Sequence, residues 1–272
     1  MSDDAVNGDS LSAATAGALP VVPPGSPFVV WIRLIRPAAL LLVLVPALTA
    51  LALLWVRSAR IMALPAISGL VSLTLVQAGA SLLDVYLEYA RRARLPDSDR
   101  HDQLTARALL AQSHAHPLNV LRVSIALMVL GALVGIPLIV SGGWPVVLLG
   151  VVGLAIAFLF SATAFALKRF SLADLLIGLA LGPGIVVGMM LSQRHAPISR
   201  DLLIAGALGL LAMLPAEGAH LRDAQQDKAL GRSTLVTTLG DGVGKAIYWL
   251  CLLAAFALLA IAALPRGAPH GA

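Results

Sequence analysis

The segment EGAHLRDAQQDKALGRSTLVTTLG, residues 217–240, is strongly polar and lies between two long apolar runs. Asp223 and Asp227 stand four residues apart, so on a helix both carboxylates project from one face and can share a divalent cation. Three basic residues surround the pair: Arg222, Lys228 and Arg232. Interleaved acidic and basic groups suit a metal-bound polyphosphate. A solvent-facing loop between two helices explains the same composition, because runs of charge usually contact water.

The chain as a whole is too apolar for a water-soluble domain. Hydrophobic residues make up 59% of its 272 positions, charged residues make up 12%, and the mean hydropathy is +0.91. These values predict a protein embedded in a lipid bilayer. The formal charge of +5 does not indicate nucleic-acid binding, because the basic residues occupy short loops between apolar runs. The single cysteine, Cys251, excludes an internal disulfide and a thiolate metal cluster, and is expected to be a packing residue.

Seven apolar runs are long enough to cross a bilayer, since a hydrocarbon core of ~30 Å needs about 20 helical residues. They lie at residues 38–56, 61–83, 120–140, 144–166, 172–191, 201–219 and 243–264. The predicted fold class is therefore all-α, a polytopic transmembrane helix bundle of about seven spans. Prolines inside or beside the spans predict kinks at Pro46, Pro65, Pro137 and Pro183.

The two ends of the chain fall outside this predicted bundle. Residues 1–27 are polar, small and proline-rich, with no apolar run behind a basic start, so they predict a disordered tail and not a signal peptide. Residues 28–265 then form the transmembrane domain, and residues 266–272 form a short C-terminal tail.

Lysine and arginine residues are distributed unevenly between the two sides of the predicted bundle. With seven spans, fourteen of them share the side of the N-terminal flank and five lie on the opposite side. Basic residues in short loops favour the cytoplasm, so the N-terminus and both long polar loops are predicted to be cytoplasmic and the C-terminus to be outside. The expected location is a membrane of the bacterial inner-membrane type.

Acidic residues gather in the same two polar loops, which hold nine of the eleven that follow the N-terminal tail. Asp84 and Glu88, again four residues apart, end the second apolar run, where an unpaired carboxylate is costly. Together with Asp223 and Asp227 they indicate two facing carboxylate sites for one or two Mg²⁺ ions, which typically bind a few carboxylates, waters and substrate phosphate oxygens. The alternative partners of Asp84 and Glu88 are arginines of the same segment: Arg91, Arg92 and Arg94.

The segment HLRDAQQDKALGRSTLVTTLG fits the pattern NxRDxxxDxxxGxxTLxxxLG at eight positions. They are Arg222, Asp223, Asp227, Gly231, Thr234, Leu235, Leu239 and Gly240. This pattern resembles the second aspartate-rich motif of the UbiA superfamily of intramembrane prenyltransferases, and is most similar to the 1,4-dihydroxy-2-naphthoate branch of menaquinone synthesis. The likeness extends to the tract FSATAFALKRFSLADLL with Lys168 and Asp174, to LGPGIVVG with Gly182 and Pro183, and to IRP with Arg36 and Pro37.

The resemblance implies a helical bundle around a central cavity, with Mg²⁺ as cofactor and a prenyl diphosphate and an aromatic acceptor as substrates. It implies that Asp84, Asp223 and Asp227 are metal ligands, and Glu88 can substitute for the family's second Asp from the position next to Leu87. It also implies catalytic roles for Asp223, Asp227 and Lys168. The residues that would contact the diphosphate or the acceptor are Arg222, Arg232, Lys228 and His220.

The sequence also departs from the family pattern. In the first motif, Leu83 and Leu87 stand where the family has Asn and a second Asp, and in the second motif His220 replaces the Asn. This histidine can orient a carboxylate, bind the acceptor or pack against its neighbours. The family commonly has nine spans, so the resemblance implies a bundle without the last two, or a membrane partner subunit that supplies them. The alternative function is a catalytically silent subunit that binds an isoprenoid lipid or a partner; a transporter fits less well, because its charges should lie nearer the middle of the membrane.

Overall fold

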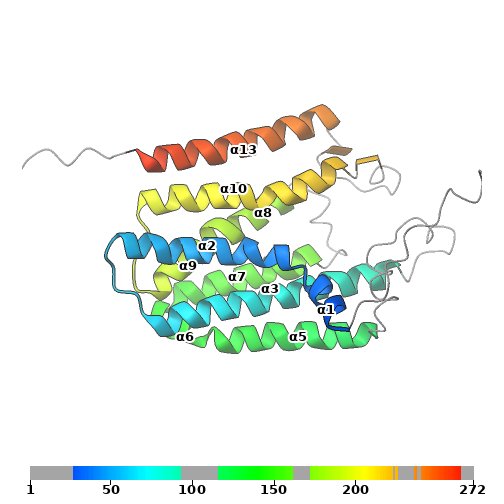
Figure 1. Cartoon of the computed structure of the whole chain (residues 1–272), viewed down its shortest axis with the longest axis horizontal. Coiled ribbons are helices and arrows are strands. Elements are labelled where there is room, and N and C mark those ends of the chain that lie inside the picture. The colour runs from blue at the N-terminus through cyan, green and yellow to red at the C-terminus, as the bar shows by residue number, and fades with distance from the viewer. Residues whose placement is uncertain are drawn as a thin grey trace, which may run out of the picture.

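The computed structural model describes residues 27–92, 116–161, 172–222, 224–225, 236–237 and 240–264, and within these ranges every regular element is a helix (Figure 1). The elements are α1 (Pro27–Ile35), α2 (Pro37–Val56), α3 (Ala63–Arg92), α5 (Pro117–Val134), α6 (Ile136–Gly142), α7 (Trp144–Ser161), α8 (Leu172–Leu179), the π-helical turn η4 (Ala180–Gly184), α9 (Ile185–Ser192), α10 (Ser199–Arg222) and α13 (Asp241–Ala263). The long helices run side by side as one bundle, which confirms the predicted all-α fold.

Six stretches of the described chain are long and apolar enough to cross a membrane. They are Pro37–Val56, Ala63–Leu87, Pro117–Gly142, Asp174–Ser192, Ser199–Arg222 and Asp241–Ala263, and each coincides with one of the predicted spans. A shorter apolar helix, Trp144–Ile156, lies within the remaining predicted span at residues 144–166, whose last residues lie outside the described ranges. Large apolar side chains such as Trp55 and Val140 are exposed on the outside of the bundle, where lipid can surround them.

A short helix, α1, precedes the first span, where the sequence had suggested only a basic flank. Arg36 separates it from α2 with a left-handed φ of 57°, and Pro37 then begins α2. Proline suits the first helical turn because its missing N–H has no partner there in any case. Val30 and Leu34 of α1 are buried in an apolar cluster whose other buried members are Leu82, Val85 and Val120. Helix α1 is therefore packed against α3 and α5.

The prolines predicted to kink the spans act in different ways. Pro137 stands near the start of α6, just after Gly135 divides α6 from α5. Pro183 lies inside η4, where a wider helical turn accommodates a residue that lacks an N–H and whose ring would clash with the preceding turn. Pro46, in contrast, lies inside α2, which continues past it, and Pro65 lies in the first turn of α3.

The bundle has two distinct ends. The first, here called the motif end, holds α1, the C-terminal ends of α3 and α10 and the N-terminal end of α13 (Figure 1). The second, here called the turn end, holds the α2–α3 and α9–α10 connections. At the turn end, Arg57 Nη1 lies 3.1 Å from Asp201 Oδ2, and the Met62 N–H donates to Gln193 Oε1 at 2.7 Å. These contacts join the two connections. The C-terminal ends of α3 and α10, which precede the two long polar loops of the sequence, lie at the opposite end of the bundle.

Candidate functional site

Close backbone packing between α8–η4 and α10 determines which side chains meet at the motif end. A Cβ atom on Gly182 would lie 2.3 Å from the Gly209 nitrogen and 2.4 Å from the Ala205 oxygen, and one on Gly178 would lie 2.9 Å from the Gly209 oxygen. The two helices therefore touch without intervening side chains, which small residues allow in membrane bundles. Asp174 precedes Gly178 by one helical turn, so it projects from the same face of α8 toward α10.

The matching face of α10 carries the other members of the site. Gly209, Met213 and Glu217 follow one another at four-residue intervals, and His220 comes three residues later, so all four lie on one side of the helix. Met213 fills the space beside Gly178, where its Cγ and Sδ would each lie 2.8 Å from an added Cβ. The same stripe thus brings Glu217 and His220 opposite Asp174.

Asp174, Glu217 and His220 form a compact buried cluster, here called the α8–α10 triad. Asp174 is 5% exposed and Glu217 is 1% exposed, whereas the His220 side chain is 26% exposed. His220 Nδ1 lies 3.7 Å from Asp174 Oδ2, and the Glu217 carboxyl group lies close to both. One ligand atom from each residue lies within 4.8 Å of the other two, and in the described part of the chain no other group of three such residues is placed to hold a metal ion.

Two polar atoms of the triad have no hydrogen-bond partner in the protein: Glu217 Oε2 and His220 Nδ1. Both are buried, and a buried polar atom without a partner costs about 1–3 kcal/mol. Two adjacent carboxyl groups in an apolar bundle also repel each other when both are ionised, so the cluster requires a positive charge or a shared proton. The triad is therefore suited to receive a cation or a hydrogen-bond donor from outside the described chain.

Asp84 lies at the same end of the bundle as the triad but is not part of it. Its side chain is 27% exposed, and its Oδ2 lies 3.8 Å from Arg36 Nη1, which comes from the α1–α2 junction. This contact differs from the alternative drawn from the sequence, which paired Asp84 with arginines of its own helix. The side chain of Glu88 lies outside what the structure describes, so its predicted metal role is untested.

Of the residues predicted for the diphosphate site, two are described. Arg222 is the exposed last residue of α10, at the motif end, and His220 faces Asp174. The other predicted positions, Asp223, Asp227, Lys168, Lys228 and Arg232, lie outside the described residues and their roles stay predictions.

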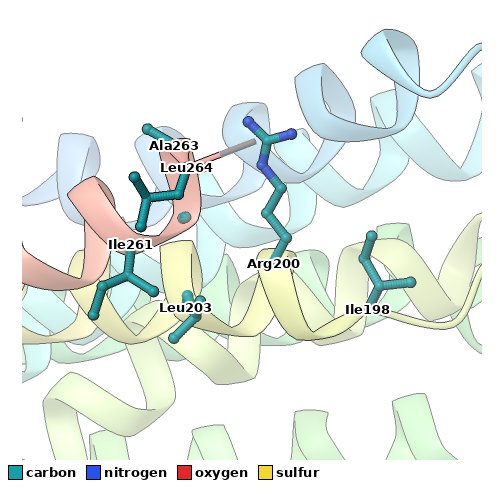
Figure 2. Close-up of a pocket in the computed structure, with 7 residues that line it drawn as sticks. Ile198, Arg200, Leu203, Ile261, Ala263 and Leu264 are labelled. Atoms are coloured by element: carbon teal, nitrogen blue, oxygen red, sulfur yellow. The ribbon is translucent and has the colours of Figure 1, made fainter. Parts of the chain in front are cut away.

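A cavity of about 400 Å³ lies at the turn end, between the start of α10 and the end of α13. Apart from Arg200, its lining residues are apolar, among them Leu203, Ile261 and Leu264 (Figure 2). Arg200 and Glu217 stand at opposite ends of α10, so this cavity is not part of the site that contains the triad.

Comparison with known proteins places the chain in a family. Residues 43–270 match the UbiA prenyltransferase family. The chain belongs to this family. A relative from Bacillus subtilis (strain 168), 1,4-dihydroxy-2-naphthoate octaprenyltransferase, is 24% identical over 214 residues, which are 78% of this chain and 66% of the relative. The chain thus spans just under two thirds of that protein.

A solved structure extends the comparison to the fold. The UbiA homolog from Archaeoglobus fulgidus bound to GPP and Mg²⁺ superposes with a TM-score of 0.63 and 16% identity. The match covers 88% of this chain and 80% of the archaeal chain. Family membership and the six membrane-length helices together identify this UbiA protein as an integral membrane protein.

Asp174 and Glu217 have no predicted role from the sequence. Two signals could have found them. Asp174 is a carboxylate within an apolar run, and such residues in membrane spans are usually functional. Glu217 and His220 are three residues apart, a spacing that places two ligands on one helix face and is also used by carboxylate-bridged metal sites in helix bundles.

Proposed function

We propose that this UbiA family member transfers a prenyl group from a prenyl diphosphate to an aromatic or quinone-precursor acceptor, with Mg²⁺ as cofactor. The observation that carries the proposal is that its polar groups lie at one end of the bundle. This end holds Asp84, Arg36 and the C-terminal end of α10, and Asp223 is the next residue after α10. The relative named as a naphthoate octaprenyltransferase supports 1,4-dihydroxy-2-naphthoate as the acceptor. The archaeal homolog named as bound to GPP and Mg²⁺ supports the diphosphate and the metal.

The chemistry of the predicted donor set fits Mg²⁺. Its members, Asp84, Glu88, Asp223 and Asp227, are all carboxylates, and oxygen is the ligand atom that Mg²⁺ prefers. Mg²⁺ also retains several waters, which suits Asp84 because its side chain is partly exposed. When bound, Mg²⁺ supplies positive charge that stabilises the leaving diphosphate.

Basic residues of the chain itself would bind and orient the diphosphate. Arg36 and Arg222 are exposed at the motif end, and Lys168, Lys228 and Arg232 are predicted to join them. Their positive charge favours breakage of the allylic C–O bond, in which the electron pair leaves with the diphosphate. The allylic carbon then bonds to an electron-rich ring carbon of the acceptor, and the ring loses a proton. A central cavity between apolar helices would hold the isoprenoid tail and keep water from the cation.

We further propose that the motif end faces the cytoplasm of a cell with a membrane of the bacterial inner-membrane type. The fourteen-to-five distribution of basic residues supports this orientation. Reporters fused near Arg94 and Arg232 should be cytoplasmic, and one fused near His270 should be outside. A cytoplasmic reporter near His270 would contradict the predicted number of spans.

One observation favours the second candidate function, a catalytically silent UbiA-like subunit that binds an isoprenoid lipid or a membrane partner. Leu83, at the position of the family's first-motif Asn, is only 8% exposed and belongs to the apolar core. Leu87 occupies the position of the second Asp. The first motif thus offers fewer oxygen ligands than the family pattern does.

A direct assay distinguishes the two functions. Purified protein is incubated with Mg²⁺, prenyl diphosphates of several lengths and candidate quinone precursors, and the products are analysed by mass spectrometry. We expect a prenylated acceptor, and we expect Asp223→Asn and Asp227→Asn each to lower turnover by roughly 10–100-fold or more, as loss of groups that support a metal does. The matched control is Asp241→Asn, which removes an exposed carboxylate that pairs with Lys245 on α13. Diphosphate binding without any product would favour the silent subunit.

A further inference from the structure

The α8–α10 triad contains two carboxyl groups, those of Asp174 and Glu217, that the proposed prenyl transfer does not use. Glu217 is the most deeply buried member, and its Oε2 has no hydrogen-bond partner in the protein. His220 Nδ1, on the next turn of α10, is likewise buried without a partner and points toward Asp174. Native proteins rarely leave buried polar atoms of this kind without a partner unless a water or an ion binds them. The triad is thus incomplete as a purely protein network.

We propose that Asp174, Glu217 and His220 bind one transition-type divalent cation such as Zn²⁺, at a site separate from the predicted Mg²⁺ ligands. A divalent cation would contact both unpartnered atoms and neutralise the two adjacent carboxylates. A water could satisfy the hydrogen bonds, whereas a divalent cation would also supply positive charge to the two adjacent carboxyl groups.

The spacing of the ligand atoms is compatible with one shared ion. His220 Nδ1 and Asp174 Oδ2 lie 3.7 Å apart. If each atom binds the metal at ~2.1 Å, the angle between the two bonds at the metal is about 120°. This angle is near that of a tetrahedral or trigonal site. The third ligand atom, from Glu217, lies within 4.8 Å of both. Two ligand atoms on opposite sides of a metal lie about 4.2 Å apart, so a small movement of the side chain lets all three atoms bind one ion.

The donor types select against Mg²⁺. An imidazole nitrogen together with two carboxylate oxygens suits Zn²⁺ and its neighbours in the first transition row, whereas Mg²⁺ prefers oxygen ligands and keeps several waters. Asp174 and Glu217 are almost fully buried, which leaves little room for a hydrated ion. Asp84, in contrast, has a partly exposed side chain that accepts a hydrated Mg²⁺.

The site would also have a structural effect, because its ligands come from two helices. Asp174 belongs to α8, and Glu217 and His220 belong to α10. A bound ion therefore joins these helices at the motif end, just beyond their glycine contact. Because the ion binds the folded state, its addition should raise the free energy of unfolding. At ion concentrations above the Kd, this increase should grow with the logarithm of the ion concentration.

The test measures metal binding by the full chain in detergent, without any prenyl diphosphate. After treatment with a chelator, the protein is titrated with Zn²⁺ against a chromophoric competitor in excess Mg²⁺, and X-ray absorption at the zinc edge reports the ligands. We expect one Zn²⁺ per chain, a nitrogen and oxygen shell with one imidazole, and a higher unfolding midpoint with Zn²⁺. We expect Glu217→Gln and His220→Asn to weaken binding by at least about 100-fold, since losing an outer-shell partner alone costs 10–100-fold.

Three control variants separate this site from others. His195→Asn removes a histidine at the turn end, and Asp241→Asn removes an exposed carboxylate on α13, so both should bind Zn²⁺ as the wild type does. Asp227→Asn, which removes a predicted Mg²⁺ ligand, should change Zn²⁺ affinity by less than about twofold. An equal loss in Asp227→Asn would overturn the separation of the two sites.

The remaining outcomes decide the ligand set. Absence of stoichiometric Zn²⁺ in the wild type, or a shell that lacks imidazole, overturns the proposal even if every variant fails to fold. Since the readout is binding and spectroscopy, a protein without prenyl transfer activity can still pass this test, and an active enzyme can still fail it.

Discussion

The contact between Gly182 and Gly209 offers a direct test of how the fold positions the site. In Gly182→Ala, the new Cβ would lie 2.3 Å from the Gly209 nitrogen and 2.5 Å from its Cα. Ordinary contacts begin near 3.4 Å, so α8–η4 and α10 must separate by about 1 Å. Both colliding groups are backbone atoms, which no side-chain rotation can move away.

The expected energy follows from two opposing effects. Overpacking of a tight contact costs about 1–3 kcal/mol, and backbone collisions fall at the upper end of that range. Alanine in place of glycine within a helix recovers up to about 1 kcal/mol. The net result should be a loss of about 1–2 kcal/mol. Gly150→Ala in α7 is the matched control, because its added Cβ meets no atom within 4 Å and only the helix-favouring effect remains.

Reversible unfolding in mixed detergent and sodium dodecyl sulfate, followed by circular dichroism, measures both variants. Gly182→Ala should unfold at a lower denaturant fraction than wild type, and Gly150→Ala at an equal or higher one. Separation of the helices should also move Asp174 from His220 and weaken Zn²⁺ binding in Gly182→Ala alone. If Gly182→Ala were as stable as Gly150→Ala, the close packing of α8–η4 on α10 would be refuted.

Two further predictions concern the ends of the bundle. Leu87→Asp restores a carboxylate one helical turn from Asp84, so it should tighten Mg²⁺-dependent binding of prenyl diphosphate, measured by calorimetry; destabilisation without tighter binding would support the silent subunit. Arg57→Ala removes the ion-pair partner of the buried Asp201 carboxylate, which still accepts from the Ile198 N–H, and should cost about 1–3 kcal/mol of unfolding free energy. The exposed Arg60 lies in the same connection, and its alanine variant should unfold like the wild type.

The helices were predictable from sequence because hydropathy is a local property. A run of about 20 apolar residues can satisfy its backbone in lipid only as a helix, whatever its neighbours are. Helix α1 was missed because nine residues cannot span a bilayer, and only contacts with α3 and α5 reveal that Val30 and Leu34 are buried. The wide turn at η4 was likewise foreseen only as a kink at Pro183.

The site was predictable only where its residues are neighbours in the chain. The spacing of Glu217 and His220 follows from the helix repeat, and the position of Asp84 at the end of a span follows from hydropathy. The arrival of Asp174 opposite Glu217 depends on the glycine contact between two helices, which no local pattern encodes. Sequence reasoning therefore found the polar end of the bundle but not the pairing within it.

Under the proposed function and the proposed zinc site, the departures from the family pattern would change the metal chemistry of the motif end in a consistent direction. On α3, Leu83 and Leu87 replace residues that would offer oxygen atoms near Asp84, where water has access. On α10, His220 replaces an amide with an imidazole nitrogen and lies beside the buried Glu217. Fewer exposed oxygen ligands weaken the retention of hydrated Mg²⁺, whereas a buried nitrogen and two carboxylates strengthen the retention of Zn²⁺. A protein with these substitutions should therefore depend on the diphosphate itself to hold Mg²⁺, and should keep its second metal when the substrate leaves.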